Sequence, residues 1–291
     1  MCKLCARSWR RECRHQFSLR QVFALLCVLA ALFGVASFHI RLEEARRRSA
    51  APILWANGYV EHEFLSPGMS AVVLEYSGLG DCRLIELTDI LKKEAGLRVL
   101  CLGHTDITDA GLVGLVQLQQ IRDLRLNGTA VTDAGMEAIG RLAALENLSL
   151  GRTHVTGKGI ARLEGLARLR SLNLSGTRIE DEDLEYLCVL AASLEVLDVS
   201  ETSVTGEGLK RLISLPRLRE LDISETRIDG AAVRWIPKLT SLRVLYIDST
   251  SIDRKSVDWL KKRSLRLDIR MTGYPLDYST TRVHDEELTE D

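Results

Sequence analysis

The stretch that decides the fold is "HTDITDAGL", from His104 to Leu112. A related phrase returns 24 residues later as "GTAVTDAGM", Gly128 to Met136, and again as "RTHVTGKGI", Arg152 to Ile160. An internal period of this length is typical of proteins built from stacked repeats. Cutting the chain at this interval gives seven consecutive units, which begin at Leu97, Ile121, Leu145, Leu169, Leu194, Leu218 and Leu242.

Each unit contains two patterns of apolar residues. The first is L-x-x-L-x-L, as in Leu97, Leu100 and Leu102, and its alternating end predicts a short strand with one buried face. The second places an apolar residue at every third position, as in 112–118, and predicts a short helix with one buried stripe. Such a unit can bury its apolar residues only against its neighbours, so the sequence predicts an α/β solenoid.

The polar phrase between strand and helix contains two recurrent hydroxyls. One threonine position is shared by all seven units: Thr105, Thr129, Thr153, Thr177, Thr202, Thr226 and Thr250. A buried hydroxyl there can bond backbone groups of the turn that would otherwise be unsatisfied. Three residues further on stands a threonine, as at Thr108 and Thr205, or an acidic residue, which suits the N-cap of the following helix.

These units resemble the leucine-rich repeats. L-x-x-L-x-L is present in all seven units when Ile or Val is allowed for Leu, and threonine replaces the usual Asn or Cys after the strand. This "LxxLxLxxTxITDxGL" variant is similar to repeats of bacterial, planctomycete-type membrane-anchored proteins. The resemblance covers about two thirds of the chain. It implies parallel strands on a concave face and short helices on a convex face, and it indicates almost nothing about function.

A second strong feature precedes the repeats. "VFALLCVLAALFGVASFHI", Val22 to Ile40, has no charged residue over 19 positions. As a helix it would be roughly 28 Å long, close to the apolar thickness of a bilayer. Six basic residues precede it and four follow it before residue 49, which favours a cytoplasmic amino terminus and an extracytoplasmic repeat domain. A signal peptide cleaved near residues 35–37 and a buried soluble helix remain as alternatives.

The predicted organisation has six parts. They are a basic cytoplasmic leader (1–21), a transmembrane helix (22–40), a juxtamembrane stalk (41–70), a degenerate amino-terminal capping repeat (71–96), the leucine-rich-repeat domain (97–271) and an acidic carboxyl-terminal tail or cap (272–291).

Two surfaces are candidate partner sites. On the concave face, the residue between the two strand leucines should point toward water in every unit. With neighbouring positions, this gives the candidate partner-binding residues Arg125, Asn127, Asn173, Asp198, Glu220, Asp222, Tyr246 and Asp248. The alternative is that these side chains only solvate the strands. On the convex face, Trp235 and Trp259 lie one repeat apart. The need of a terminal repeat for a cover favours a cap formed over them by "TGYPLDY" at 272–278, and the alternative is an exposed apolar patch that marks an interface.

No catalytic residue, cofactor site or metal site is predicted. "CKLC" at Cys2 to Cys5, with Cys13 and His15, contains zinc-ligand types, but reduced cysteines fit a short basic leader better. The net charge of −1 gives no reason to expect nucleic-acid binding.

The sequence therefore predicts a non-enzymatic, single-pass membrane protein that contacts the bilayer through Val22 to Ile40 and acts in protein–protein or envelope interactions. One alternative is a structural envelope scaffold without a discrete partner site. The other is an F-box-like ubiquitin-ligase adaptor, against which the predicted anchor argues.

Overall fold

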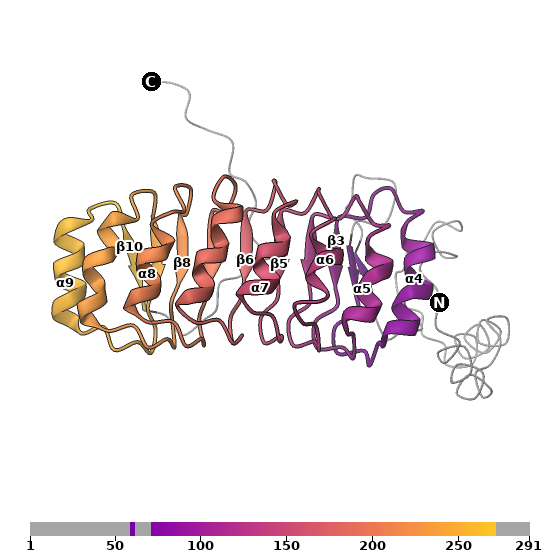
Figure 1. Cartoon of the computed structure of the whole chain (residues 1–291), viewed down its shortest axis with the longest axis horizontal. Helices are drawn as coiled ribbons and strands as arrows, with labels where there is room; N and C mark the ends of the chain where they lie inside the picture. Colours follow the sequence, from indigo (N-terminus) through magenta and orange to yellow (C-terminus); the bar gives the residue numbers. More distant parts are fainter. Residues whose placement is uncertain (1–58, 62–70, 272–291) are drawn as a thin grey trace, which may run out of the picture. The chain divides into compact units, whose positions relative to one another are not determined.

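The computed structural model of the protein describes residues 59–61 and 71–271. In this part of the chain ten strands form one sheet, and their order in the sheet is their order in the sequence (Figure 1). The strands are β1 (Tyr59–Glu61), β2 (Ala71–Val73), β3 (Val99–Cys101), β4 (Asp123–Arg125), β5 (Asn147–Ser149), β6 (Ser171–Asn173), β7 (Val196–Asp198), β8 (Glu220–Asp222), β9 (Val244–Tyr246) and β10 (Asp268–Arg270).

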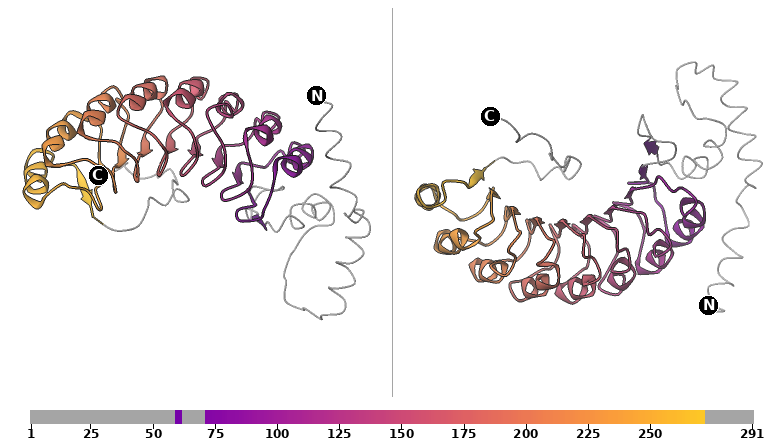
Figure 2. Two further views of the ribbon diagram at one scale, coloured as in Figure 1. Left: turned by 60° about the horizontal axis from the view of Figure 1, so that its bottom comes forward. Right: turned by 90° about the horizontal axis from the view of Figure 1, so that it is seen from above.

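Short helices follow the strands from β2 to β9. They are α4 (Asp81–Leu91), α5 (Asp109–Leu115), α6 (Met136–Ile139), α7 (Gly157–Ile160), η2 (Ala161–Leu163), η3 (Glu182–Leu190), α8 (Gly206–Leu212), η4 (Gly230–Lys238) and α9 (Arg254–Arg263). The η elements are 3-10 helices. Within the repeat domain, strands line the concave face and helices the convex face (Figure 2).

The repeat period sets the strand register. Val99 pairs with Asp123, and Asp123 pairs with Asn147, all in parallel. The extra residue of the fourth unit does not disturb this register, because Ser171 pairs with Val196, its equivalent in the next unit. Among the ten described strands, only β1 is antiparallel to its neighbour. The parallel solenoid predicted from the 24-residue period is therefore confirmed in the described residues.

The core is a continuous column of leucine-type side chains between sheet and helices. Leu100 in β3 and Leu102 just after it, and Leu112 and Leu118 from the helical side, have no solvent exposure. Each buried side chain of this size contributes about 1.5–3 kcal/mol relative to an exposed one. Because every repeat adds the same set, the array is stabilised repeat by repeat.

The predicted threonine column is confirmed. In all seven units the hydroxyl donates to the carbonyl three residues earlier, as Thr105 Oγ1 does to Leu102 at 2.6 Å. Ser77 makes the same bond to Leu74 in the segment before the first unit. The bond stays within one repeat, so each hydroxyl closes its own turn.

The turn after each strand contains a left-handed residue that the sequence pattern did not reveal. The position has φ between 53° and 58° at six non-glycine residues: Tyr76, His104, Arg152, Glu201, Glu225 and Ser249. Gly128 and Gly176 fill it in two other repeats, with φ of 67° and 63°. A non-glycine residue in this region costs stability, so the closely bonded turn around it must compensate at each repeat.

The predicted transmembrane helix at Val22–Ile40 lies outside the described residues. Within 59–61 and 71–271, no helix has both the length and the apolar character needed to cross a bilayer.

Candidate interaction surfaces

Neighbouring repeats are joined by an aspartate in the helical turn. Asp109 accepts two bonds from the next repeat, one from the Thr132 backbone N–H at 2.8 Å and one from the Thr132 hydroxyl at 2.7 Å. The same pair of bonds joins Asp81 to Thr108, Asp133 to Thr156, and Asp181 to Thr205. We call each such contact between consecutive repeats a seam.

The glycine of the repeated phrase makes room for this aspartate. A Cβ on Gly135 would lie 2.5 Å from Asp109 Oδ1, closer than any real side chain tolerates. Gly111, Gly159 and Gly208 meet the aspartates of their own seams at the same distance. Each residue of "TDAG" except Ala thus has a role in a seam. Thr donates hydrogen bonds to the aspartate of the previous repeat, and Asp accepts hydrogen bonds from the next repeat. Gly leaves space for the carboxylate of the previous repeat.

Three seams use a different arrangement. Between the third and fourth units, Gly157 replaces the aspartate and faces Asp183, which stands where glycine is usual. Asp183 instead accepts a bond from the Glu180 N–H in its own turn at 3.1 Å. In the last two seams, Gly206 faces the Ala232 methyl group and Gly230 faces the Ser256 hydroxyl. No aspartate bridges these last two seams among the described residues.

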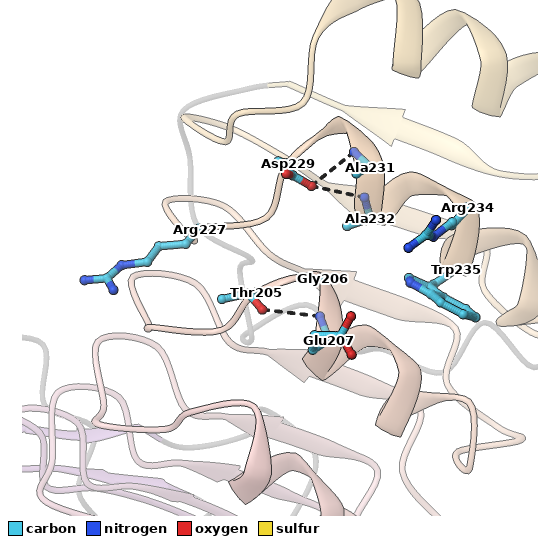
Figure 3. Close-up of a pocket in the computed structure, with 9 residues that line it drawn as sticks. All are labelled: Thr205, Gly206, Glu207, Arg227, Asp229, Ala231, Ala232, Arg234 and Trp235. Carbon is cyan, nitrogen blue, oxygen red and sulfur yellow. Dashed lines mark hydrogen bonds between the residues drawn. The ribbon is translucent and has the colours of Figure 1, made fainter.

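Each of the last two seams opens into a groove. The first has a volume of about 240 Å³ and is lined by residues of α8 and η4, including Thr205, Gly206, Ala232 and Trp235 (Figure 3). The second has a volume of about 310 Å³ and lies between η4 and α9, beside Trp259. A bridging aspartate would occupy part of each space, so its absence leaves the grooves open.

The predicted N-caps are present in most units. The Thr108 and Thr205 hydroxyls accept from the backbone N–H two residues later at 3.3 Å. Asp229 caps η4 by accepting from Ala231 and Ala232, and Asp253 caps α9 by accepting from Ser256. The caps predicted at Thr132 and Thr156 are not confirmed, because α6 begins after Gly135 and Thr156 makes no cap bond to α7.

Four predicted concave residues are buried. Asp198 is 1% exposed and Asp222 is 3% exposed, and Asn173 and Tyr246 are also buried. The expectation that this column faces water is therefore wrong at these positions. Arg125, Asn127, Glu220 and Asp248 are partly exposed. They are the predicted concave residues that present polar surface to solvent.

The buried polar side chains form a hydrogen-bonded row. Asn173 Nδ2 donates to Asp198 Oδ2 at 3.0 Å, and Ser200 donates to Asp198 Oδ1 from its N–H at 2.9 Å and its hydroxyl at 2.6 Å. Asp222 accepts from the Ser224 N–H at 2.8 Å. These bonds explain how carboxylates are tolerated at such low exposure.

Burial also changes the acidity of this row. Loss of solvent, followed by repulsion from Asp198, raises the pKa of Asp222 to about 6. Burial likewise raises the pKa of Asp123, although its ion pair with Arg125 at 3.3 Å opposes the shift. At the end of the sheet, Arg270 donates to the Tyr246 hydroxyl at 2.9 Å.

The convex candidates are surrounded by cations. Three basic groups lie over the half-buried Trp235 ring: Lys238 at 4.2 Å from its centroid, Lys210 at 4.9 Å and Arg234 at 5.3 Å. Trp259 is 39% exposed, with Arg263 5.0 Å from its ring. Residues 272–278, predicted as an alternative cover, lie outside the described part.

The residues that the structure describes contain no group of three His, Cys, Asp or Glu side chains able to hold a metal ion. The zinc-ligand types at Cys2, Cys5, Cys13 and His15 lie outside those residues. Nothing positive in the described geometry points to a catalytic constellation.

Comparison with known proteins agrees with the geometry. The family described as Leucine Rich repeat matches residues 118–140 and 168–188, and the described residues have the fold of a leucine-rich-repeat solenoid. Among solved structures it is similar to internalin C2 of Listeria monocytogenes, with 23% identity and a TM-score of 0.53 over 70% of this chain and 81% of that one. No curated protein sequence matches the chain. In all, 396 solved chains match the structure, a likeness too widely shared to indicate one function.

Proposed function

We propose that this protein is a membrane-anchored leucine-rich-repeat protein that binds a protein partner, without catalysis, on the concave face of its solenoid. The observation that supports this most directly is the row of partly exposed polar side chains on the sheet. Arg125, Asn127, Glu220 and Asp248 lie on or at the ends of strands whose register is fixed by the repeat. Extended concave sheets of this kind suit recognition of a protein surface.

The rigidity of the array favours binding. Aspartates bridge four of the seven seams, and the leucine core is continuous through all the described units. A surface held in one conformation loses little conformational entropy when a partner docks. A partner would therefore meet a preorganised row of charges and amides.

The charge distribution indicates what that partner presents. Glu220 and Asp248 are partly exposed near Asp222, whose pKa is already raised to about 6 by burial and by Asp198. Another carboxylate placed there would be repelled, whereas a cation would be attracted. The carboxyl-terminal half of the concave face thus fits a basic partner surface.

The test is capture of partners from the native membrane fraction with the full chain. Glu220→Lys combined with Asp248→Lys reverses the concave charge. Glu164→Lys combined with Glu182→Lys makes the same net change at two exposed convex positions. We expect the concave variant to lose the captured protein about tenfold or more, as for disruption of a complementary charged interface, and the convex variant to retain it. Equal recovery by both variants contradicts the proposal.

The anchor and its orientation have a separate test. We propose that Val22–Ile40 spans the membrane with the amino terminus in the cytoplasm, because basic residues are more numerous before it. A reporter that is active only after export, fused after Asp291, should be active. Activity of a cytoplasm-only reporter at that position would show the opposite orientation.

A structural scaffold is the second candidate, and one observation favours it. The Asn173–Asp198 bond and the serine bonds to Asp198 satisfy part of the concave row internally. A surface that satisfies its own polar groups has less need of a partner. Retention of the protein in the envelope fraction by both charge variants, with no protein captured by the unmodified chain, would favour the scaffold.

A further inference from the structure

We propose a second docking surface, on the convex side of the last two seams, for an acidic segment of a protein partner. It is centred on Trp235 and Trp259 and includes Arg234, Lys238 and Arg263. We call it the cationic aromatic surface. It lies on the helical side of the repeats, opposite the concave sheet, so its test succeeds or fails independently of the concave proposal.

The cations of this surface are not neutralised by any residue that the structure describes. Arg234, Lys238 and Arg263 lie against tryptophan rings at 5.3, 4.2 and 5.0 Å. Within the described residues, none of the three has a carboxylate within ion-pair distance. Stacking on a ring orients a cation without removing its charge, so these groups remain available to an anionic partner.

Two earlier repeats have a different residue at the position of Trp235. Arg162 and Arg211 occupy the helical position of Trp235 in their own units. Arg162 pairs with Glu137 at 3.8 Å, and Arg211 pairs with Glu185 at 2.6 Å. In these two repeats the position therefore holds an arginine that is paired with a carboxylate. In the last two it holds a tryptophan, beside cations that have no ion-pair partner among the described residues.

The grooves give the surface its shape. The groove at Trp235 holds about 240 Å³, and the adjacent one at Trp259 about 310 Å³. Figure 3 shows Arg234 and Trp235 together on η4, with Glu207 on α8 across the groove. A side chain of a docked segment could enter the space between Gly206 and Trp235, while neighbouring carboxylates reach the cations at the rim.

A protein segment fits this surface better than an anionic bilayer. Glu207 and Asp229 line the same groove as Arg234, and both are exposed. A uniformly negative membrane would meet these carboxylates as well as the cations. A segment can instead place its acidic side chains beside Arg234, Lys238 and Arg263 only, which is how charge patterns give specificity.

The experiment is fluorescence anisotropy with the full chain and a short fluorescein-labelled peptide in which glutamate and serine alternate. We expect Lys238→Gln and Trp235→Ala each to weaken binding by about tenfold, and a matched glutamine–serine peptide to bind the unmodified chain at least about tenfold more weakly. Arg162→Gln is the matched control and should leave binding unchanged. Lys238 is exposed, so its variant keeps the test valid if Trp235→Ala perturbs folding.

Three outcomes would overturn the proposal. The first is equal binding of the glutamate and glutamine peptides. The second is binding of vesicles containing phosphatidylserine without binding of the glutamate peptide, which would assign the surface to a membrane. The third is peptide binding that occurs only after removal of residues 284–291, "HDEELTED", which would assign the surface to the chain's own acidic end.

Discussion

The seams of the first repeats and those of the last repeats fill the space between neighbouring helical turns in two different ways. In the first set, an aspartate such as Asp109 reaches the next repeat and accepts two hydrogen bonds from Thr132. Gly135 leaves room for its carboxylate. In the last two, Gly206 faces Ala232 and Gly230 faces Ser256, and a groove opens instead. Polar bonding joins the first seams, whereas the last ones leave accessible space beside a tryptophan.

A simple rule covers both sets. At each of seven seams, one of the two facing positions is glycine: Asp81/Gly111, Asp109/Gly135, Asp133/Gly159, Gly157/Asp183, Asp181/Gly208, Gly206/Ala232 and Gly230/Ser256. Two side chains cannot share the space, because a Cβ on any of these glycines would lie 2.6 Å or closer to an atom of its partner. The identity of the non-glycine partner then decides whether the seam is bonded or open.

The Gly157/Asp183 seam offers the strongest test of this rule. Gly157→Asp would press a side chain against the Asp183 backbone, whose Cα would lie 2.8 Å from the new Cβ, and would bring two carboxylates together. We expect a loss of about 2–4 kcal/mol in the free energy of unfolding, as for an overpacked, like-charged site, measured by urea denaturation.

The second substitution in the same pair supplies the control. Asp183→Gly added to Gly157→Asp gives this seam the Asp/Gly pair of the first seams, although Glu180 replaces the threonine that donates its hydroxyl there. Relief of the steric clash should therefore recover part of the lost stability. If the double variant is no more stable than Gly157→Asp alone, the two positions do not share the space as argued.

Removing one bridging aspartate tests the bonded seams. Asp109→Ala leaves the Thr132 N–H and hydroxyl without their acceptor, and we expect a loss of about 1–3 kcal/mol. Glu137→Ala removes only exposed ion pairs with Arg141 and Arg162, so it should cost about 0–1 kcal/mol. Equal midpoints for the two variants would mean that the seam bonds contribute no more than a surface pair.

The sequence predicted the array better than its surfaces. The leucine rhythm and the 24-residue interval determined strand register, core and turn, because each unit repeats the same contacts. The seam contacts could also have been found, since Asp and Gly exchange places at Gly157 and Asp183. The burial of Asp198 could not, because alternation along a strand gives the face of a side chain but not how closely its neighbours cover it.

The threonine column gives a smaller contrast along the array. Thr177 is buried, and its hydroxyl bonds the Leu174 carbonyl at 2.5 Å, whereas Thr250 is half-buried. Thr177→Val should lower the free energy of unfolding by about 1 kcal/mol, because the carbonyl keeps only its weaker bond from the Thr177 N–H at 3.2 Å. Thr250→Val should cost less, since water can replace its hydroxyl. A larger loss at Thr250 would contradict the burial argument.

An effect of similar size concerns the pH dependence of stability at the carboxyl-terminal end of the concave face. Burial and the nearby Asp198 raise the pKa of Asp222 to about 6 in the folded protein, compared with about 3.9 for an unfolded aspartate. The folded state therefore binds this proton more tightly than the unfolded state. The resulting stability is present in full below about pH 4 and is lost as the pH rises through about 6.

The Asp222→Asn side chain cannot ionise. The free energy of unfolding of this variant, relative to that of the unmodified protein, should therefore rise by about 1 kcal/mol between pH 4 and pH 7.5, after allowance for solvent screening. Urea denaturation of both proteins at the two pH values measures this difference directly. An equal pH dependence for both proteins would mean that Asp222 is solvated and that its pKa is not raised by burial and by Asp198.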